Sequence, residues 1–259
     1  MTDNSVMSFP DHWDDGTDPA SPDHQVHWYD ARTVIIRQAL RTNFEGPFLY
    51  LLLGTERALL LDTGTGHVKL RPLVESLLSG QELIVAHTHA HGDHVGGDAE
   101  FDSVVGRSPE EVAAYFGIAD WPNDVVQLDL GDRVLDIIPI PGHHASHVAV
   151  YDRATRLLIS GDSLYPGRLY VFDWPAFRAS VRRLADFVAA GNPVEWIAGA
   201  HIELTDRPGV DYEMGADHHP GEHELPLDPA VLTELAEVLE EAGPEPVRIV
   251  RDHFIVYPV

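Results

Sequence analysis

Residues 87–97 read HTHAHGDHVGG, and this run constrains the chain more than any other stretch of its sequence. Four histidines and one aspartate fall within eight positions, and a glycine pair closes the run. A lone histidine is usually a surface residue or a satisfied core residue, but His89, His91, Asp93 and His94 together form the pattern H-x-H-x-D-H. Imidazole and carboxylate groups are the ligands of zinc and similar metals. We therefore expect a metal site here.

The local structure decides which of these side chains can share a metal. The run follows an apolar segment, ELIVAHT, which predicts a strand. His89 and His91 lie two residues apart, so their side chains project the same way just past its end. Asp93 and His94 are adjacent and point apart in an extended chain, so both can serve a second metal only if the loop turns, which the neighbouring glycines permit. His87 lies inside the strand, and we expect a structural or supporting role for it.

Further residues of the metal-ligand type follow other apolar segments. They are His143, His144 and His147 after DIIPI, Asp162 after RLLIS, and His201 after PVEWIA. Strand ends share one rim of a folded sheet, where a site can be built from distant parts of the chain. The same order recurs at each place: an apolar strand, a small residue, and then a residue of the metal-ligand type. This recurrence predicts that the residues form one site at such a rim.

Composition excludes several classes of protein. The 259 residues contain no cysteine, so any metal must be held by His, Asp and Glu. A formal net charge of −25 argues against nucleic-acid partners and against an anionic membrane surface. No apolar run approaches the roughly 20 residues of a membrane span. The acidic N-terminus lacks the features of a signal peptide, so we expect a cytoplasmic protein.

Turn signals and hydrophobic periodicity predict short strands and a few helices. Residues 1–26 predict a flexible or loosely docked acidic arm, and residues 27–259 predict a single domain. Most strands are joined by tight turns, which favours antiparallel pairing in two packed sheets with helices on their outer faces, an α+β architecture. Helices are expected over residues 67–80, 108–117, 174–191 and 228–243, and the last residues, 247–259, predict a strand pair or one long strand.

A long Pro/Gly-rich segment at about 202–227 follows His201 and predicts a loop rimming the site, of the kind that sets substrate choice. It contains His218, His219 and His223. These histidines are either exposed loop residues or ligands of an additional metal.

Five motifs taken together resemble the metallo-β-lactamase-fold hydrolases, in particular the glyoxalase II-like and lactonase-like members. They occur in the family's order across roughly residues 30–205. The motifs are L-D-T-G at 61–64, T-H-x-H-x-D-H at 88–94, P-G-H at 141–143, G-D at 161–162 and G-A-H at 199–201. The resemblance implies a four-layer αβ/βα sandwich with a two-metal site, usually zinc, on one edge.

Matching positions carry the family's ligand set onto this chain. The resemblance implies that one metal is held by His89, His91 and His143, that the second is held by Asp93, His94 and His201, and that Asp162 bridges the two. Such ligands suit two zinc ions, and also iron or manganese. Two metals roughly 3.5–4 Å apart can share a hydroxide and polarise a substrate carbonyl.

Four residues are candidates for additional roles near these metals. We expect Asp93 to orient the hydroxide and to pass a proton to the leaving group. Lactone-cleaving relatives place a tyrosine shortly after the bridging aspartate, so either Tyr165 or Tyr170 is expected to donate to a developing oxyanion. Asp62 is either a residue that orients a ligand or a turn residue before Gly64.

The expected function is hydrolysis of an ester, thioester or lactone of a small molecule by a metal-bridging hydroxide. Residues 202–259 contain few basic residues, which argues against glutathione as part of the substrate. The alternatives are a phosphodiesterase or β-lactamase of the same fold, a mononuclear-iron oxygenase acting on persulfides, and a metal-binding protein without activity. A homo-oligomer is compatible with the sequence.

Overall fold

Side chains along the first strands alternate between two buried faces. The computed structural model describes residues 7–259, so the first residues of the predicted arm lie outside the described part. In β3 (Phe48–Leu53), Tyr50 and Leu52 contribute to one apolar cluster, whereas Leu49 and Leu51 contribute to another. A strand that is buried on both faces must lie inside a layered structure.

Two sheets form the centre of the molecule. The first has the order β1-β2-β3-β4-β5, antiparallel except for the parallel pair β4–β5. The second has the order β12-β11-β9-β8-β7-β6, antiparallel except for the parallel pair β9–β11. The bounds of the first sheet's other strands are β1 (His24–Asp30), β2 (Thr33–Gln38), β4 (Arg57–Leu61) and β5 (Glu82–Ala86). Those of the second are β6 (Val126–Asp129), β7 (Val134–Pro139), β8 (Val148–Asp152), β9 (Leu157–Gly161), β11 (Trp196–Gly199) and β12 (Pro226–Leu227).

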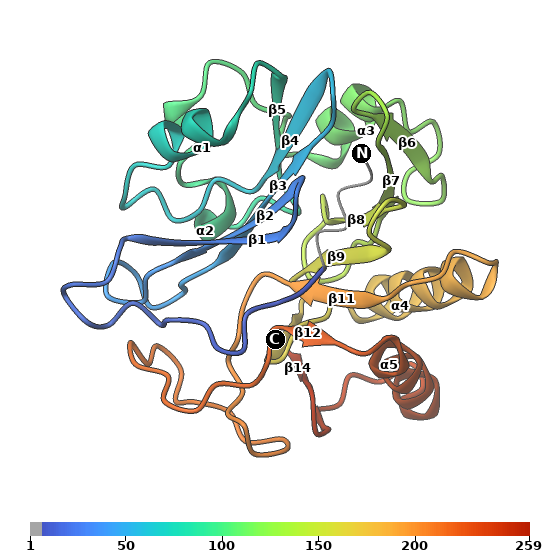
Figure 1. Ribbon diagram of the computed structural model, residues 1–259. Coiled ribbons are helices and arrows are strands. Elements are labelled where there is room, and N and C mark those ends of the chain that lie inside the picture. Colours follow the sequence, from blue (N-terminus) through green and yellow to red (C-terminus); the bar gives the residue numbers. More distant parts are fainter. Residues whose placement is uncertain (1–6) are drawn as a thin grey trace.

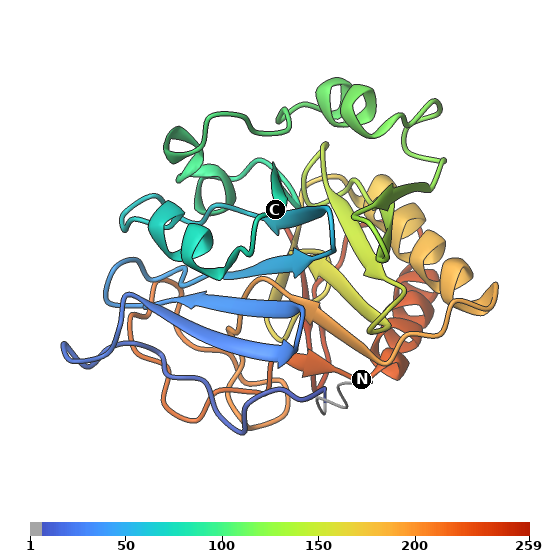
Figure 2. The same cartoon turned by 45° about the horizontal axis from the view of Figure 1, so that its top comes forward.

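Helices cover the outer faces of both sheets, which confirms the predicted αβ/βα sandwich (Figures 1 and 2). Helix α1 (Arg71–Leu77) lies against the first sheet, where its Val74 joins the cluster formed by Leu49 and Leu51. Helices α4 (Trp174–Ala189) and α5 (Pro229–Ala242) pack together on the second sheet. The cluster that contains Tyr50 fills the space between the sheets. The shorter helices are α2 (Gly92–Val95), α3 (Pro109–Phe116) and a 3-10 turn at Asp98–Glu100.

Local capping signals predict the helix ends better than hydrophobic periodicity does. Ser108 caps α3 through a reciprocal capping box with Glu111, and Asp228 caps α5 by accepting from the backbone N–H of Ala230. Helix α1 is shorter than the expected 67–80 because it starts only at Arg71, with a proline in its first turn.

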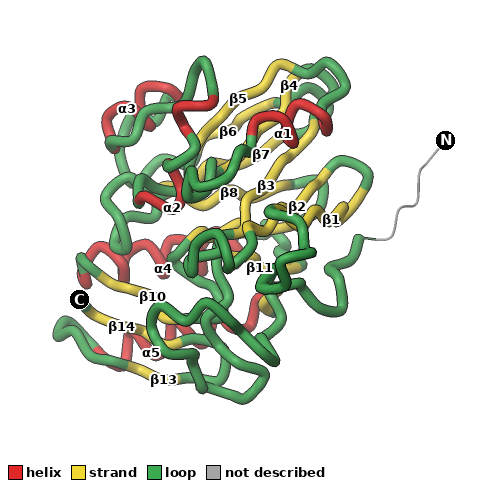
Figure 3. Tube along the Cα trace, turned by 90° about the vertical axis from the view of Figure 1, so that its left-hand side faces the viewer, coloured by secondary structure: helices red, strands yellow, loops and turns green. Residues whose placement is uncertain are grey.

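A third sheet, with the order β10-β14-β13, lies beside α4 and α5 (Figure 3). Its strands are β10 (Arg168–Val171), β13 (Ile249–Val250) and β14 (Ile255–Pro258). The C-terminal residues form the strand pair that was one of the two expectations. The parallel pairing of β14 with β10 joins residues that are far apart in the chain, and no local pattern predicted it.

The N-terminal segment from residue 7 to residue 23 contacts both sheets. The backbone N–H of Leu40 donates to the carbonyl of Asp15, and Trp13 packs edge-on against Phe48. Phe9 packs against Tyr29 and Trp196. The two large aromatic side chains bury apolar area against both sheets, which explains the docking of an otherwise acidic segment.

None of the helices within residues 7–259 is long and apolar enough to cross a membrane.

Candidate metal centre

The predicted ligands come together at one rim of the sandwich. His89 and His91 follow β5, His143 follows β7, Asp162 follows β9 and His201 follows β11. The seven predicted side chains form two groups, and within each group the candidate ligand atoms lie within 4.8 Å of one another. The groups are His89, His91 and His143, and Asp93, His94, Asp162 and His201.

The three-histidine group is a triangle of ring nitrogens. Nε2 of His89 lies 3.0 Å from Nδ1 of His91 and 3.1 Å from Nε2 of His143, and the last two nitrogens are 3.0 Å apart. Nitrogens bound at 2.0–2.1 Å to a tetrahedral zinc would be separated by about 3.3 Å. The triangle is therefore close to the size that one metal ion requires.

A contact on the opposite ring nitrogen holds His143 in place. Nδ1 of His143 donates to the backbone carbonyl of Tyr170 over 2.8 Å, which directs Nε2 into the triangle. Gly142 comes directly before His143 with a φ of 142°, and a Cβ there would lie 2.4 Å from the Cα of Phe177 in α4. The glycine of the P-G-H motif is thus needed for the close approach of α4.

The second group depends on the single turn of α2. Because residues 92–95 are helical, the adjacent Asp93 and His94 both reach the site. This is the turn of the chain that the sequence analysis required if both were to serve one metal. Oδ2 of Asp93 lies 3.1 Å from Nε2 of His94 and 3.2 Å from Nε2 of His201. Nδ1 of His201 donates to the backbone carbonyl of Glu45 over 2.9 Å.

Asp62 is the partner that orients His94. Its Oδ2 accepts from Nδ1 of His94 over 2.9 Å, and its Oδ1 accepts from the backbone N–H of Thr88 over 2.7 Å. Asp62 is fully buried and has a φ of 72°, which is unusual for a residue other than glycine. Asp62 was expected either to orient a ligand or to be a turn residue before Gly64. Its direct contact with the candidate ligand His94 favours the first role.

Asp162 lies between the two groups. Its Oδ2 is 3.5 Å from Nε2 of His143, and its Oδ1 is 3.5 Å from Nε2 of both His94 and His201. Each carboxylate oxygen thus faces a different group. This is the arrangement that a bridging ligand requires.

The residues present fit a pair of metal ions. Nε2 of His94 and Oδ1 of Asp162 are buried and lack a hydrogen-bond partner among the described residues. An unsatisfied buried polar atom is costly unless another group compensates it. The donors are imidazole nitrogens and carboxylate oxygens, which suit zinc, iron or manganese.

The electrostatics of the two groups are opposite. Burial lowers the pKa of His89 well below its usual value and lowers that of His143 to about 4. Burial also lowers the pKa of His94 and His201, but Asp93 and Asp162 outweigh this effect. They raise the pKa of His201 to about 10 and that of His94 well above its usual range. Without metal, the first group is neutral and the second holds protons.

A cavity of about 320 Å³ opens next to both groups. Apart from candidate ligands and Gly92, it is lined by Glu45, Tyr165, Tyr170, Phe172 and Glu203. The Tyr165 hydroxyl is buried, donates to the carbonyl of Arg168 over 2.5 Å and lies 2.9 Å from Glu203. The Tyr170 hydroxyl accepts from Nε of Arg168 over 2.9 Å and donates to Oε1 of Glu203 over 3.5 Å, at the upper limit of a hydrogen bond.

The other histidines have separate partners. His87 is buried against Asp98, 2.8 Å away, and so occupies a structural position. His147 is fully buried and its Nδ1 lies 2.7 Å from Oγ of Ser163. His144 contacts Ser146, with its ring 5.0 Å from that of His91.

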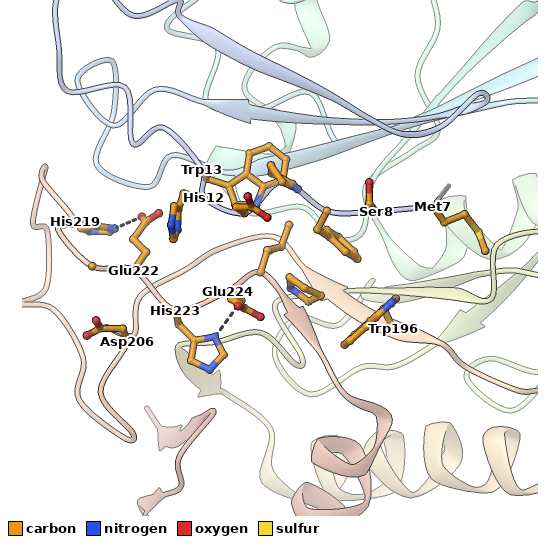
Figure 4. A pocket seen from close by; sticks show the side chains of 16 residues that line it. Met7, Ser8, His12, Trp13, Trp196, Asp206, His219, Glu222, His223 and Glu224 are labelled. Carbon is orange, nitrogen blue, oxygen red and sulfur yellow. Dashed lines mark hydrogen bonds and ion pairs between the residues drawn. The ribbon is translucent and has the colours of Figure 1, made fainter. Parts of the chain in front are cut away.

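The histidines of the rim loop, residues 202–227, do not form a metal site within residues 7–259. His218 contacts Asp15, His219 stacks on Tyr212 and contacts Glu222, and His223 contacts His253. A larger cavity of about 470 Å³ lies between this loop and the N-terminal segment, and none of the seven candidate ligands lines it (Figure 4).

Three polar residues near the site were not anticipated from the sequence. Glu45 and Glu203 line the cavity, and Arg168 donates to two residues of the rim loop, Glu203 and Asp211. Glu203 lies two residues after His201, which is a signal that could have identified it. Glu45 and Arg168 come from an ordinary turn and an ordinary strand, and only the folded chain brings them to the site.

Comparison with known proteins gives a consistent assignment. A family model described as the Metallo-beta-lactamase superfamily matches residues 43–231. Among curated proteins, the acyl-coenzyme A thioesterase MBLAC2 of Bos taurus is 28% identical over 210 residues, covering 63% of this chain and 70% of that protein. The hydroxyacylglutathione hydrolase of Xanthomonas euvesicatoria pv. vesicatoria (strain 85-10) is 31% identical over 154 residues, and the match covers 55% of this chain and 57% of that protein.

Solved structures show the same fold. A metallo-beta-lactamase from Pontibacter korlensis superposes with a TM-score of 0.58 at 17% identity, covering 84% of this chain and 99% of that one. At this identity the likeness concerns the arrangement of strands and helices.

Proposed function

The chain belongs to the metallo-beta-lactamase superfamily, and from this premise we propose that it is a metal-dependent hydrolase of small-molecule thioesters, with related esters and lactones as further substrates. The observation that carries the proposal is the pair of adjacent ligand groups with Asp162 between them. The names of the two curated relatives support thioesters as the first class to test.

We propose that the site holds two divalent ions, most naturally zinc. His89, His91 and His143 would hold one ion, Asp93, His94 and His201 the other, and Asp162 would contact both. When bound, the two ions would supply a water of lowered pKa and a Lewis acid for the ester carbonyl. The rest of the chemistry belongs to the side chains around them.

Asp93 is the proposed proton carrier. Its Oδ2 faces His94 and His201, and its side chain also lines the cavity in which a substrate would lie. A carboxylate in this position can accept a hydrogen bond from the attacking water and hold it in line with the carbonyl carbon. A carboxylate oxygen of Asp93 that is not bound to the metal could then receive the proton and pass it to the departing thiol or alcohol.

Tyr170 is the proposed donor to the carbonyl oxygen as negative charge develops on it. Arg168 donates to the Tyr170 oxygen, and the phenol proton makes only a long 3.5 Å contact with Glu203, so it can turn towards a substrate carbonyl in the cavity. The Tyr165 hydroxyl donates to a backbone carbonyl instead. We therefore assign Tyr165 a positioning role beneath the cavity.

Initial rates on matched substrates, combined with metal analysis, test this function. We expect cleavage of a thioester, an aryl ester and a lactone by purified protein, loss of that cleavage with a chelator, and about two equivalents of metal per chain. A β-lactam and a phosphodiester complete the panel. Faster cleavage of the phosphodiester than of all carbonyl substrates would contradict the proposal, as would chelator-insensitive hydrolysis.

A further inference from the structure

Apart from the candidate ligands themselves, the cavity beside the metal groups has no positive side chain from residues 7–259. No lysine or arginine of this part of the chain contributes to its lining. The nearby Arg168 is 5% exposed and already donates to Glu203, Asp211 and the carbonyl of Tyr212, each over 2.8 Å, and to Tyr170. An anionic substrate group would have to replace these contacts to gain Arg168 as a partner.

One carboxylate in the cavity, by contrast, is free. Glu203 is occupied, since its oxygens accept from the side chain and backbone of Arg168 and contact the Tyr165 hydroxyl. The Glu45 carboxylate has no hydrogen-bond or ion-pair partner within residues 7–259, although it is partly buried.

Backbone contacts fix the position of Glu45. Its N–H donates to Oδ1 of Asn43 over 2.9 Å, and its carbonyl accepts from Nδ1 of His201 over 2.9 Å. The next residue, Gly46, turns the chain with a φ of 43°. This free carboxylate is therefore held on the turn that also orients a candidate ligand.

Aromatic faces complete the cavity. Tyr170 and Phe172 line it together with Glu45, and the Phe172 side chain is 61% exposed. Aromatic faces combined with a carboxylate attract an organic ammonium group, whereas they offer nothing to a carboxylate or phosphate.

We propose, building on the hydrolase function above, that the substrate carries a positively charged ammonium group which binds at Glu45, and that Glu45 sets this preference. The neutral and aromatic walls accept the methyl or methylene groups around the charge. Substrates whose thiol half carries a carboxylate or phosphate are disfavoured beside Glu45, because its carboxylate repels them and no lysine or arginine within residues 7–259 lines the cavity.

Three thioesters test the preference, because they differ in charge while keeping a similar shape. Acetylthiocholine is cationic, S-(3,3-dimethylbutyl) thioacetate is its uncharged carbon analogue, and S-acetyl-3-mercaptopropionate is anionic. For the wild-type protein we expect kcat/KM for the cation to exceed that for the uncharged analogue by about tenfold, with the anion slowest. A ratio near one, or a preference for the anion, would overturn the proposal.

Two variants identify the source of the preference. Glu45→Gln should bring the cation-to-neutral ratio to within about twofold of one, because the amide keeps the shape and removes the charge. Glu110→Gln removes one charge from an exposed position on α3 and should keep the tenfold ratio. It thereby controls for attraction of cations by the net charge of −25. An unchanged ratio in Glu45→Gln would reject Glu45 as the determinant.

Failure of the hydrolase function gives a different result. In that case none of the three thioesters is cleaved in a chelator-sensitive way. Calorimetric titration of the metal-loaded protein with choline and with 3,3-dimethylbutan-1-ol then decides the inference by itself. Binding of choline about tenfold tighter, lost in Glu45→Gln, supports it, and equal binding of the two alcohols rejects it.

Discussion

His94 illustrates how single residues build this centre. Asp62 accepts from one ring nitrogen, and the other nitrogen faces Asp93 and Asp162. The fully buried Asp62 fixes the tautomer, so that Nε2 is left for a metal. The sequence pattern H-x-H-x-D-H identified His94, but only the structure identifies the oxygen atom that orients it.

At the same scale, the role of Asp93 can be distinguished from that of its neighbours by replacing one carboxylate oxygen with an amide nitrogen. We expect Asp93→Asn to lower kcat on a thioester by well over tenfold, because the amide can neither accept the proton from water nor pass it on. Steady-state kinetics with metal content measured on the same sample checks this. Asp217→Asn, the same change at an exposed position, should leave kcat within twofold. Near-normal turnover in Asp93→Asn would contradict the proposed role.

The two ligand groups should also respond differently to pH. In metal-free protein His143 has a pKa of about 4 and His201 one of about 10. At pH 7 the first group is therefore ready for a metal, whereas the second must release protons. Raised pKa values mean that protons compete more strongly as pH falls, so the affinity of the second group should decrease about tenfold per pH unit for each proton displaced.

Zinc titration calorimetry at pH 6, 7 and 8, in two buffers of different ionisation enthalpy, measures this. We expect one binding step with little pH dependence and one that weakens towards pH 6 with proton release. His201→Gln should remove the proton release associated with that residue. Two steps with equal pH dependence would contradict the prediction.

Among the elements, those defined by local signals were predicted and those defined by distant pairing were not. The hairpins β6–β7 and β8–β9 follow from alternation and turn residues, and α5 follows from Asp228 and its periodicity. The single turn α2 is too short to have a periodicity of its own. The pairing of β10 with β14 and the docking of Trp13 both depend on residues elsewhere in the chain.

The rim loop depends on a buried ion pair. Arg37, on β2, is 1% exposed and donates to both carboxylate oxygens of Glu222 over 2.7 and 2.5 Å. Glu222→Gln leaves the guanidinium buried without its counter-charge, so we expect a loss of about 3 kcal/mol in the free energy of unfolding. Urea denaturation checks the energy, and hydrogen exchange over residues 202–227 checks the loop.

Two comparisons keep this prediction specific. Glu224→Gln makes the same change at an exposed neighbour and should cost less than about 0.5 kcal/mol. The double variant Arg37→Met with Glu222→Leu should be more stable than Glu222→Gln, because no charge remains buried. A double variant that is less stable than Glu222→Gln would show that lost packing, and not the unpaired charge, is responsible.

Across the whole molecule, the two sheets are joined at both ends. Near the metal groups, the Tyr50 hydroxyl donates to the carbonyl of Gly199 over 2.6 Å, and Phe48 donates to Ala200 over 2.8 Å. At the other end, Arg133 pairs with Asp152 on its own sheet and donates to the carbonyls of Arg32 and Leu53. Candidate ligands from both sheets therefore meet at a rim whose geometry is fixed by cross-sheet contacts.

The overall charge leads to a prediction for the stability of the whole fold. The chain has 42 acidic and 17 basic side chains, and folding brings the excess negative charges close together. Raising NaCl from 0.01 to 0.15 M shortens the Debye length from about 30 to about 8 Å, which weakens their repulsion. We expect stability to increase by about 1 kcal/mol, or roughly 2–4 °C in Tm for a domain of this size. Calorimetry of the metal-loaded protein measures the shift, and sodium sulfate at equal ionic strength serves as a comparison. Screening depends on ionic strength, so the two salts should agree over this range. A Tm that stays constant or falls with NaCl would mean that the surface charges are already balanced by local ion pairs.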